Sequence, residues 1–187
     1  MSTSVVSICN QALIALSANL ITSITSSQKE AQLCNAVYDM SRRELLRKHP
    51  WNFAVKRQEL AQSVTAPISD FLYQYTLPAD CLRVLEVSTQ QTYKIEGRSL
   101  LTNEQTIFLR YIYDNQNPST YDDAFVNVLS TFLAYKIAYA ITQSPSQRAD
   151  LWELFSRQLT SAKYIDATED IQDQIDPRTA SLISVRF

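Results

Sequence analysis

Few residues of this chain have side chains suited to catalysis. Its one histidine, His49, stands next to Pro50, where a helix is expected to end. Catalysis by a nucleophile and a base usually needs a histidine or another base with a tuned pKa. A histidine at a helix end is more simply explained as a cap of that helix. The carboxylates are plentiful but show no paired pattern, so the sequence predicts that the chain is not an enzyme.

Metal and cofactor motifs are also missing from the sequence. The three cysteines, Cys9, Cys34 and Cys81, are far apart, and none belongs to a CxxC pair. Each stands among apolar residues, which favours small buried side chains over a disulfide framework or a zinc site. Gly97 is the only glycine, so neither a GxGxxG loop nor a P-loop can be built. We therefore expect no cofactor and no bound metal.

Aromatic residues offer one further chemistry, the stacking of nucleic-acid bases. Bases can stack on exposed tyrosine rings, but a sheet core with hydroxyls at its rim explains the tyrosines of the middle third more simply. The net charge of −2 also lacks the basic excess of nucleic-acid-binding proteins. These tyrosines are Tyr73, Tyr75, Tyr93, Tyr111 and Tyr113. The Lys and Arg side chains that cluster before them are expected to be solvated: Arg42, Arg43, Arg47, Lys48, Lys56 and Arg57.

The composition is that of a folded protein. A length of 187 residues suits one domain with room for an inserted lobe. Hydrophobic residues make up 45% and charged residues 19%, which is enough apolar material for a core. The start of the chain lacks the basic and apolar regions of a signal peptide, and no stretch approaches the ~18 apolar residues of a membrane span. We expect a protein made and folded in a cytoplasm, without a membrane partner.

Helical spacing marks two segments in the first third of the chain. Apolar residues recur at helical spacing over residues 3–18 and again over 27–49. Ser27 stands three residues before Glu30, the spacing of a capping box. Pro50 should end the second helix, because the residue before a proline avoids the helical region.

Two further helices are expected after the middle third. The segment 121–143 begins with two aspartates and is apolar nearly all round, which is typical of a helix at the centre of a bundle or covered by a partner. The segment 146–168 follows a short turn at 144–146. So short a link makes these two helices antiparallel neighbours.

Between these helix pairs the apolar period changes to that of strands. Trp51, Phe53 and Val55 alternate with Asn52, Ala54 and Lys56, and similar runs cover 71–77, 82–87, 93–95 and 107–113, with Gly97 at a tight turn. We predict a small antiparallel sheet over residues 51–113. The expected fold class is α+β, mainly α: an antiparallel helical bundle (1–50 and 114–170) with a β-rich lobe (51–113) inserted between helices two and three.

The last segment, 171–187, has a different character. It begins acidic and ends Leu182-Ile183-Ser184-Val185-Arg186-Phe187. Two interpretations stay open: a disordered end, or an arm that becomes ordered on a partner by adding a strand or by docking in a groove. The cost of leaving these apolar residues in water favours the arm.

Several motifs, in their order and spacing, resemble the tail tubular protein A family of tailed bacteriophages, the head-to-tail adaptors or gatekeepers. The resemblance covers about residues 5–168 and is weaker for any one motif alone, because each is mainly aromatic and apolar. The residues after Ile171 do not match. The matching segments are Arg43–Arg57 (RELLRKHPWNFAVKR), Phe71–Val84 (FLYQYTLPADCLRV), Tyr93–Gly97, Leu100–Asn103, Leu109–Tyr113 and Phe125–Thr142.

The resemblance implies a structural virion protein of the neck, made in the host cytoplasm. Copies of such a subunit, usually twelve, form a ring beneath the portal protein and offer a platform to the tail nozzle or the next tail component. Genomic DNA passes through the channel without sequence-specific binding, and the family brings no catalytic residues. Its fold is similar to the one expected above, a helical bundle with an inserted β-rich lobe.

The resemblance also suggests where each contact lies. In related adaptors the C-terminal segment reaches the portal, which by position alone suggests portal binding by Leu182, Ile183, Val185, Arg186 and Phe187. Candidates for the contact between ring subunits are Arg43, Arg47, Phe132, Tyr135 and Tyr139. Candidates for the tail-facing side of the lobe are Tyr73, Tyr75, Tyr93 and Gly97. The alternative function is a protein- or nucleic-acid-binding module that uses the tyrosine-rich sheet.

Overall fold

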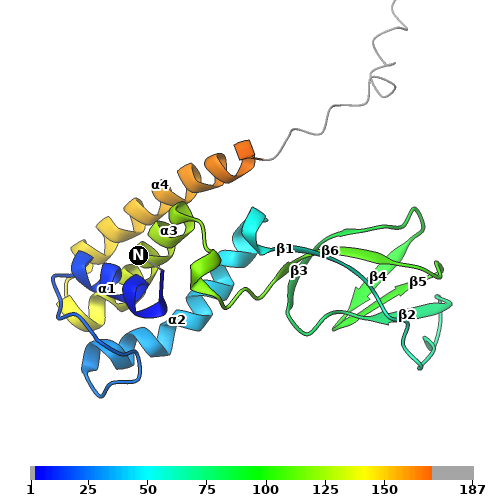
Figure 1. The fold of residues 1–187 in the computed structure, drawn as a ribbon, viewed down its shortest axis with the longest axis horizontal. Coiled ribbons are helices and arrows are strands. Elements are labelled where there is room, and N and C mark those ends of the chain that lie inside the picture. Colours follow the sequence, from blue (N-terminus) through cyan, green and yellow to red (C-terminus); the bar gives the residue numbers. More distant parts are fainter. Residues whose placement is uncertain (1–2, 170–187) are drawn as a thin grey trace, which may run out of the picture.

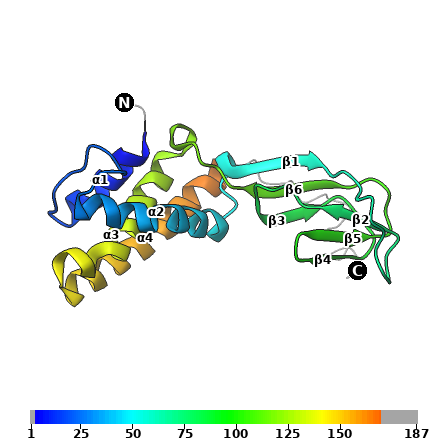
Figure 2. The ribbon, with the colours of Figure 1, turned by 90° about the horizontal axis from the view of Figure 1, so that it is seen from below.

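The chain forms two helices, then its strands, then two more helices. The computed structural model describes residues 3–169, and within them the α+β, mainly α class is confirmed. Figures 1 and 2 show an elongated molecule with the helices at one end and the strands at the other. The helices are α1 (Val5–Ala15), α2 (Lys29–Lys48), α3 (Asp123–Thr142) and α4 (Pro145–Glu169). The strands are β1 (Val55–Glu59), β2 (Tyr73–Thr76), β3 (Cys81–Val87), β4 (Tyr93–Glu96), β5 (Ser99–Thr102) and β6 (Phe108–Tyr113).

Helix α3 is the centre of the helical part. It packs on α1, α2 and, most extensively, on α4. Asp122 caps its first turn, accepting hydrogen bonds from the backbone N–H of Ala124 (2.7 Å) and Phe125 (3.3 Å). Among the described helices, α3 alone is long and apolar enough to cross a membrane, contrary to the expectation from the sequence. Core helices of folded proteins meet the same criterion, and 61% of its apolar window is buried within the fold.

The predicted capping box at Ser27 and Glu30 is wrong. Helix α2 begins at Lys29, and its N-cap, Gln28, makes no side-chain cap hydrogen bond. Ser27 therefore stands one residue before the capping position and cannot reach the N–H groups of the first turn. A reciprocal box forms instead at α1, where the Ser4 hydroxyl accepts from the backbone N–H of Ser7 (3.1 Å) and the Ser7 hydroxyl accepts from that of Ser4 (2.8 Å).

The chain between α2 and the strands does not form the expected strand. Asn52–Ala54 is a 3-10 helix, and only Val55–Glu59 pairs in a sheet. Trp51 is fully buried in the helical core, where its indole N–H donates to the carbonyl of Leu45 (3.1 Å) and its ring meets Phe125 edge-on at 5.1 Å. Packing against α3 therefore overrode the two-residue alternation of this segment.

The strands form two three-stranded antiparallel sheets, where one sheet was expected. One has the order β1-β6-β3 and the other β2-β5-β4. Strand β5 shows no apolar alternation in the sequence, because its Leu100, Leu101 and Thr102 are all buried. Gly97 occupies the predicted tight turn, between β4 and β5, with a φ of +60° that favours glycine.

Each part of the molecule has its own apolar core. The larger core joins all four helices and includes Trp51, from the link after α2, and Leu82 and Ile112, from the ends of β3 and β6 nearest the helices. The smaller core lies within the strands. Its buried members are Leu60, Tyr75, Leu77, Val87, Leu100, Ile107, Leu109 and Tyr111.

Candidate assembly surfaces

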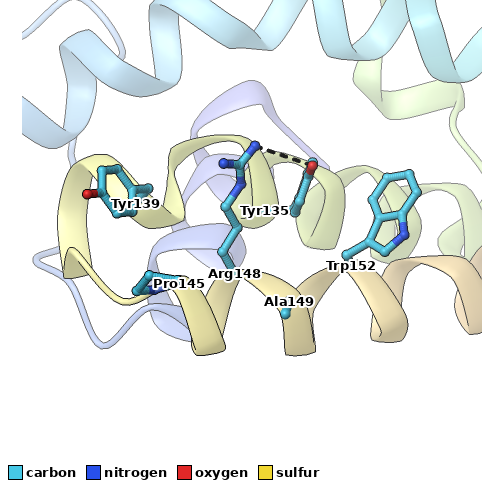
Figure 3. Close-up of a pocket in the computed structure, with 6 residues that line it drawn as sticks. All are labelled: Tyr135, Tyr139, Pro145, Arg148, Ala149 and Trp152. Carbon is cyan, nitrogen blue, oxygen red and sulfur yellow. Dashed lines mark hydrogen bonds between the residues drawn. The ribbon is translucent and has the colours of Figure 1, made fainter.

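An aromatic groove opens on the helical part, between the end of α3 and the start of α4 (Figure 3). Tyr135 and Tyr139 of α3 form one wall, one helical turn apart. Pro145, Arg148, Ala149 and Trp152 of α4 form the other wall. The tight turn at Gln143, which adopts a left-handed φ of 53°, brings the two walls together. We call this feature the aromatic groove.

Arg148 is the charged residue of the aromatic groove. Its guanidinium lies over the ring of Tyr135 at 5.0 Å, and its Nη2 donates to the Tyr135 hydroxyl at 3.3 Å. The Tyr135 and Trp152 ring centroids are 5.1 Å apart. Within residues 3–169 no carboxylate lies within ion-pair distance of Arg148. The groove thus presents aromatic surface together with a cation that keeps free donors.

The structure places only some of the candidate subunit-contact residues on the surface. Tyr139 is 56% exposed and Tyr135 half-buried, and both line the aromatic groove. Phe132 is 2% exposed and stacks on Phe155 at 4.6 Å, so it belongs to the core and cannot offer a surface to a neighbour. The sequence did not single out Arg148, although its place three residues after Pro145 put it in the first turn of the expected helix.

The two arginines predicted for the same contact lie at the other end of the helical part. Arg43 is 57% exposed, and its Nε is 3.8 Å from the Asp114 carboxylate. Arg47 is exposed, but its Nη1 donates to the carbonyl of Leu82 (2.5 Å), and Arg83 donates to the carbonyl of Arg47 (3.1 Å). Arg47 therefore already ties α2 to β3 within one subunit.

The solvated face predicted for the Lys and Arg cluster is wrong at Arg42. This side chain is 2% exposed and donates to Asp114 Oδ1 (2.5 Å) and to the carbonyl of Asn115 (2.7 Å). Burial lowers the pKa of Arg42, but the hydrogen bond and charge of Asp114 outweigh burial and leave that pKa raised. Tyr121 donates to the same Asn115 carbonyl at 2.8 Å. This network fixes the segment that returns from the strands to α3.

A second polar network fixes the segment that leads from α2 into the strands. Asp166, near the end of α4, is 8% exposed. Its carboxylate lies 2.8 Å from His49 Nε2 and accepts from the backbone N–H of Asn52 at 3.0 Å. The Asn52 side chain donates to the Asp166 carbonyl at 2.9 Å. His49 is the C-cap of α2, as expected, and it also joins α2 to α4.

The tail-side candidates do not form one surface. Tyr75 is 1% exposed and belongs to the core of the strands, so its expected place on the surface is wrong. Tyr73 is half-buried, Tyr93 is 41% exposed, and Gly97 lies on the surface. Beside Gly97, Arg98 donates to the carbonyls of Leu77 (3.3 Å) and Pro78, which places this turn at the end of the sheets nearer the helices (Figure 2).

The far tip of the strands is formed by the loop between β1 and β2. Val64 and Ile68 are fully exposed there, and Leu72 is 69% exposed. The sequence did not predict an apolar tip here. The candidate portal-binding residues Leu182, Ile183, Val185, Arg186 and Phe187 lie outside the described residues.

The cysteines of the described residues are free. Cys9 and Cys34 are fully buried and Cys81 is half-buried. The hydrogen bond with Cys34, together with burial, raises the pKa of the Cys9 thiol. That thiol is therefore a neutral core group and is unsuited to act as a nucleophile.

Comparison with protein-family models and with curated protein sequences found no match for this chain. The arrangement of the described residues supports contact surfaces: an aromatic groove with a cation, an apolar tip, and two polar networks that hold the parts of the subunit together.

Proposed function

We propose that this chain is a non-enzymatic structural subunit of a bacteriophage head-to-tail connector. Copies of it, twelve by the family resemblance, would form a ring between the portal protein and the tail nozzle or next tail component. Genomic DNA would pass through this ring. The observation that carries the proposal is the combination of the ordered sequence motifs with an elongated subunit whose strands all lie between α2 and α3 (Figure 1).

The places of the motifs support a structural role. The motif Arg43–Arg57 forms the link between the helices and the strands, where His49 and Asn52 bind Asp166 and Trp51 enters the helical core. The motif Phe71–Val84 supplies β2, the turn after it and half of β3. In a family whose members share one subunit shape, these residue types would be required by packing, without any catalytic role.

The net charge of −2 suits a channel through which DNA must slide. A basic ring would neutralise phosphates, release counterions and hold the DNA. The binding-module alternative loses support at two of its five tyrosines, because Tyr75 and Tyr111 are each 1% exposed and cannot stack on a base. The Tyr75 hydroxyl instead donates to the backbone carbonyl of Glu104 (2.9 Å), and the Tyr111 hydroxyl donates to the Asp80 carboxylate (3.1 Å).

The proposal is tested by negative-stain microscopy of the purified protein mixed with the isolated portal ring of its own virus. We expect a new layer of density on one end of the portal, with rotational symmetry. The portal alone and an unrelated portal are the controls. A well-formed portal without added density, in the presence of the folded protein, would reject the connector role, and nucleic acid and peptide binding would be tested next.

A further inference from the structure

Helix α1 has an outer face without any charge. The chain carries no Asp, Glu, Lys or Arg before Lys29. Yet part of this segment lies on the surface: Ile14 is 62% exposed and Leu20 is 54% exposed. Surfaces that meet only water normally carry charged residues, whereas the core of a protein interface is depleted of them. The outer face of α1 therefore has the composition of an interface.

Ile14 points away from the subunit to which it belongs. The buried residues of α1 are Ile8, Cys9, Ala12 and Leu13, which share one side of the helix. At about 100° per residue, Ile14 falls nearly opposite the middle of that side. Gln11, three residues earlier, is exposed on the same outer face. No rearrangement of the helical core is needed to bring this face to a partner.

The end of α1 carries a partial negative charge that no basic residue of its last turn offsets, although the carbonyls of Leu13 and Ile14 accept N–H groups from the residues that follow the helix. Ile14 stands in the last turn, and that turn has no basic residue. The free carbonyl groups of a helix C-terminus act as roughly half a negative charge and favour a nearby cation. A partner that brings an arginine and apolar surface to this position would satisfy both the helix end and Ile14.

The aromatic groove offers those two features on the other side of the molecule. Tyr139 and Trp152 supply apolar surface that is 56% and 46% exposed. Arg148 supplies a cation without a carboxylate partner in residues 3–169. In Figure 3, α1 lies behind α3, away from the groove, and Figure 2 places α1 and the turn between α3 and α4 on opposite sides of the helical part.

We propose that the aromatic groove of one copy receives the end of α1 of the next copy. Ile14 packs against the exposed aromatic surface of the groove, and Arg148 meets the last carbonyls of the neighbour's α1. Because the two surfaces differ and lie on opposite sides, each contact leaves one of each kind free, and repetition forms a ring where the rotation between copies closes. This inference rests on the proposed connector role and names the contact that builds its ring.

The test uses two variants of the full chain, each with one added cysteine. Gln11→Cys lies on the outer face of α1 and Ala149→Cys lines the groove, and neither removes Ile14, Arg148 or an aromatic ring. The two variants, carrying tags of different mass, are mixed and treated with a short bismaleimide. One sample holds the concentrated chain alone, and a second holds the chain with the portal.

We expect a mixed dimer of the two variants and little dimer of either variant with itself. A mixture of Ala149→Cys with Glu59→Cys, an exposed position on β1, is the mismatched control. The unsubstituted chain measures any reaction of Cys81. Adding Ile14→Asp to the Gln11→Cys chain should lower the mixed product roughly tenfold or more, the loss expected for a central interface residue. Because Ile14 is exposed, this change should leave the fold intact.

The outcomes separate this contact from the connector role. A portal that gains its layer while neither sample yields mixed dimer above the mismatched control overturns the contact and leaves the connector role standing. Mixed dimer in the concentrated chain, lost on Ile14→Asp, supports the contact even where the portal gains no layer. If both the layer and the mixed dimer are absent, both proposals are rejected.

Discussion

At the residue scale, Arg42 shows how a single charge can hold two parts of a chain together. It is buried, and its guanidinium binds Asp114 and the carbonyl of Asn115, more than seventy residues away. The helical period of α2 predicted which apolar side chains of this helix face the core. The partner of Arg42 could not be predicted, because spacing along one helix carries no information about a distant loop.

Arg42→Ala should therefore destabilise the protein far more than the same change at its neighbour. Removing the guanidinium leaves Asp114, only 15% exposed, without its main counter-charge. We expect a loss of about 3–5 kcal/mol in the free energy of unfolding, the usual cost of breaking a buried pair from one side. Arg43→Ala, the control, should cost less than about 1 kcal/mol, since Arg43 is 57% exposed. Urea unfolding measures both, and equal losses would contradict the assignment.

Tyr111 should make the protein sensitive to alkaline pH. Burial, and then the hydrogen bond to Asp80, raise its pKa to about 12. A tyrosine in the unfolded chain has a pKa of about 10. The folded state thus holds the proton more tightly, so its stabilisation is complete below pH ~10 and is lost as the pH rises toward 12.

Alkaline unfolding of Tyr111→Phe should have a shallower pH dependence between those two values than the unsubstituted protein. Circular dichroism follows the unfolding, and ultraviolet absorbance follows tyrosinate formation. Tyr93→Phe is the matched control, because Tyr93 is 41% exposed. Burial also raises the pKa of Tyr121 to about 12, so part of the pH dependence should remain. An unchanged slope in Tyr111→Phe would rule out this account.

At the element scale, long helices could be predicted from their regular apolar spacing. The places where tertiary packing changes a local pattern could not be predicted. The segments expected at 121–143 and 146–168 are α3 (Asp123–Thr142) and α4 (Pro145–Glu169), because each carries many apolar residues at one period. The strand expected from Trp51 failed, because Trp51 and Phe53 pack on Phe125 of α3 instead. Only part of the aromatic groove was predicted. Tyr135 and Tyr139 were candidates because α3 is apolar on most sides, whereas Arg148 is recognised as part of the groove only from the packing of α4 beside α3.

Asp166 should hold the last turns of α4 in place. Asp166→Ala removes the contacts to His49 and Asn52, and we expect a loss of about 1–3 kcal/mol, typical of hydrogen bonds to a charged group. Amide hydrogen exchange should become faster in residues 160–169 and 49–54 together. Glu153→Ala, exposed on the same helix, should leave both segments unchanged. Faster exchange in one segment alone would show that Asp166 does not couple them.

At the scale of the whole molecule, the proposed connector needs a separate end for each partner. Deleting residues 171–187 is expected to leave a folded protein that no longer joins the portal, because the described core lies entirely within residues 3–169. Circular dichroism and thermal unfolding check the fold, and co-sedimentation with the portal checks the joining. Joining retained by the truncated chain would remove the portal-binding role from this segment.

The pairing of β1 with β6 has a consequence for how such a protein can vary. Val55, the first residue of β1, lies opposite Ile112, near the end of β6. Cα atoms opposite each other in an antiparallel pair are only about 5 Å apart. The chain therefore leaves the helices and returns to them at almost one point, so a short loop in place of residues 56–111 would span the gap, provided that it replaced the packing of Leu82 on the helical core. The strands therefore form a unit that a related chain could exchange for another, changing the partner that they contact while the helices stayed the same.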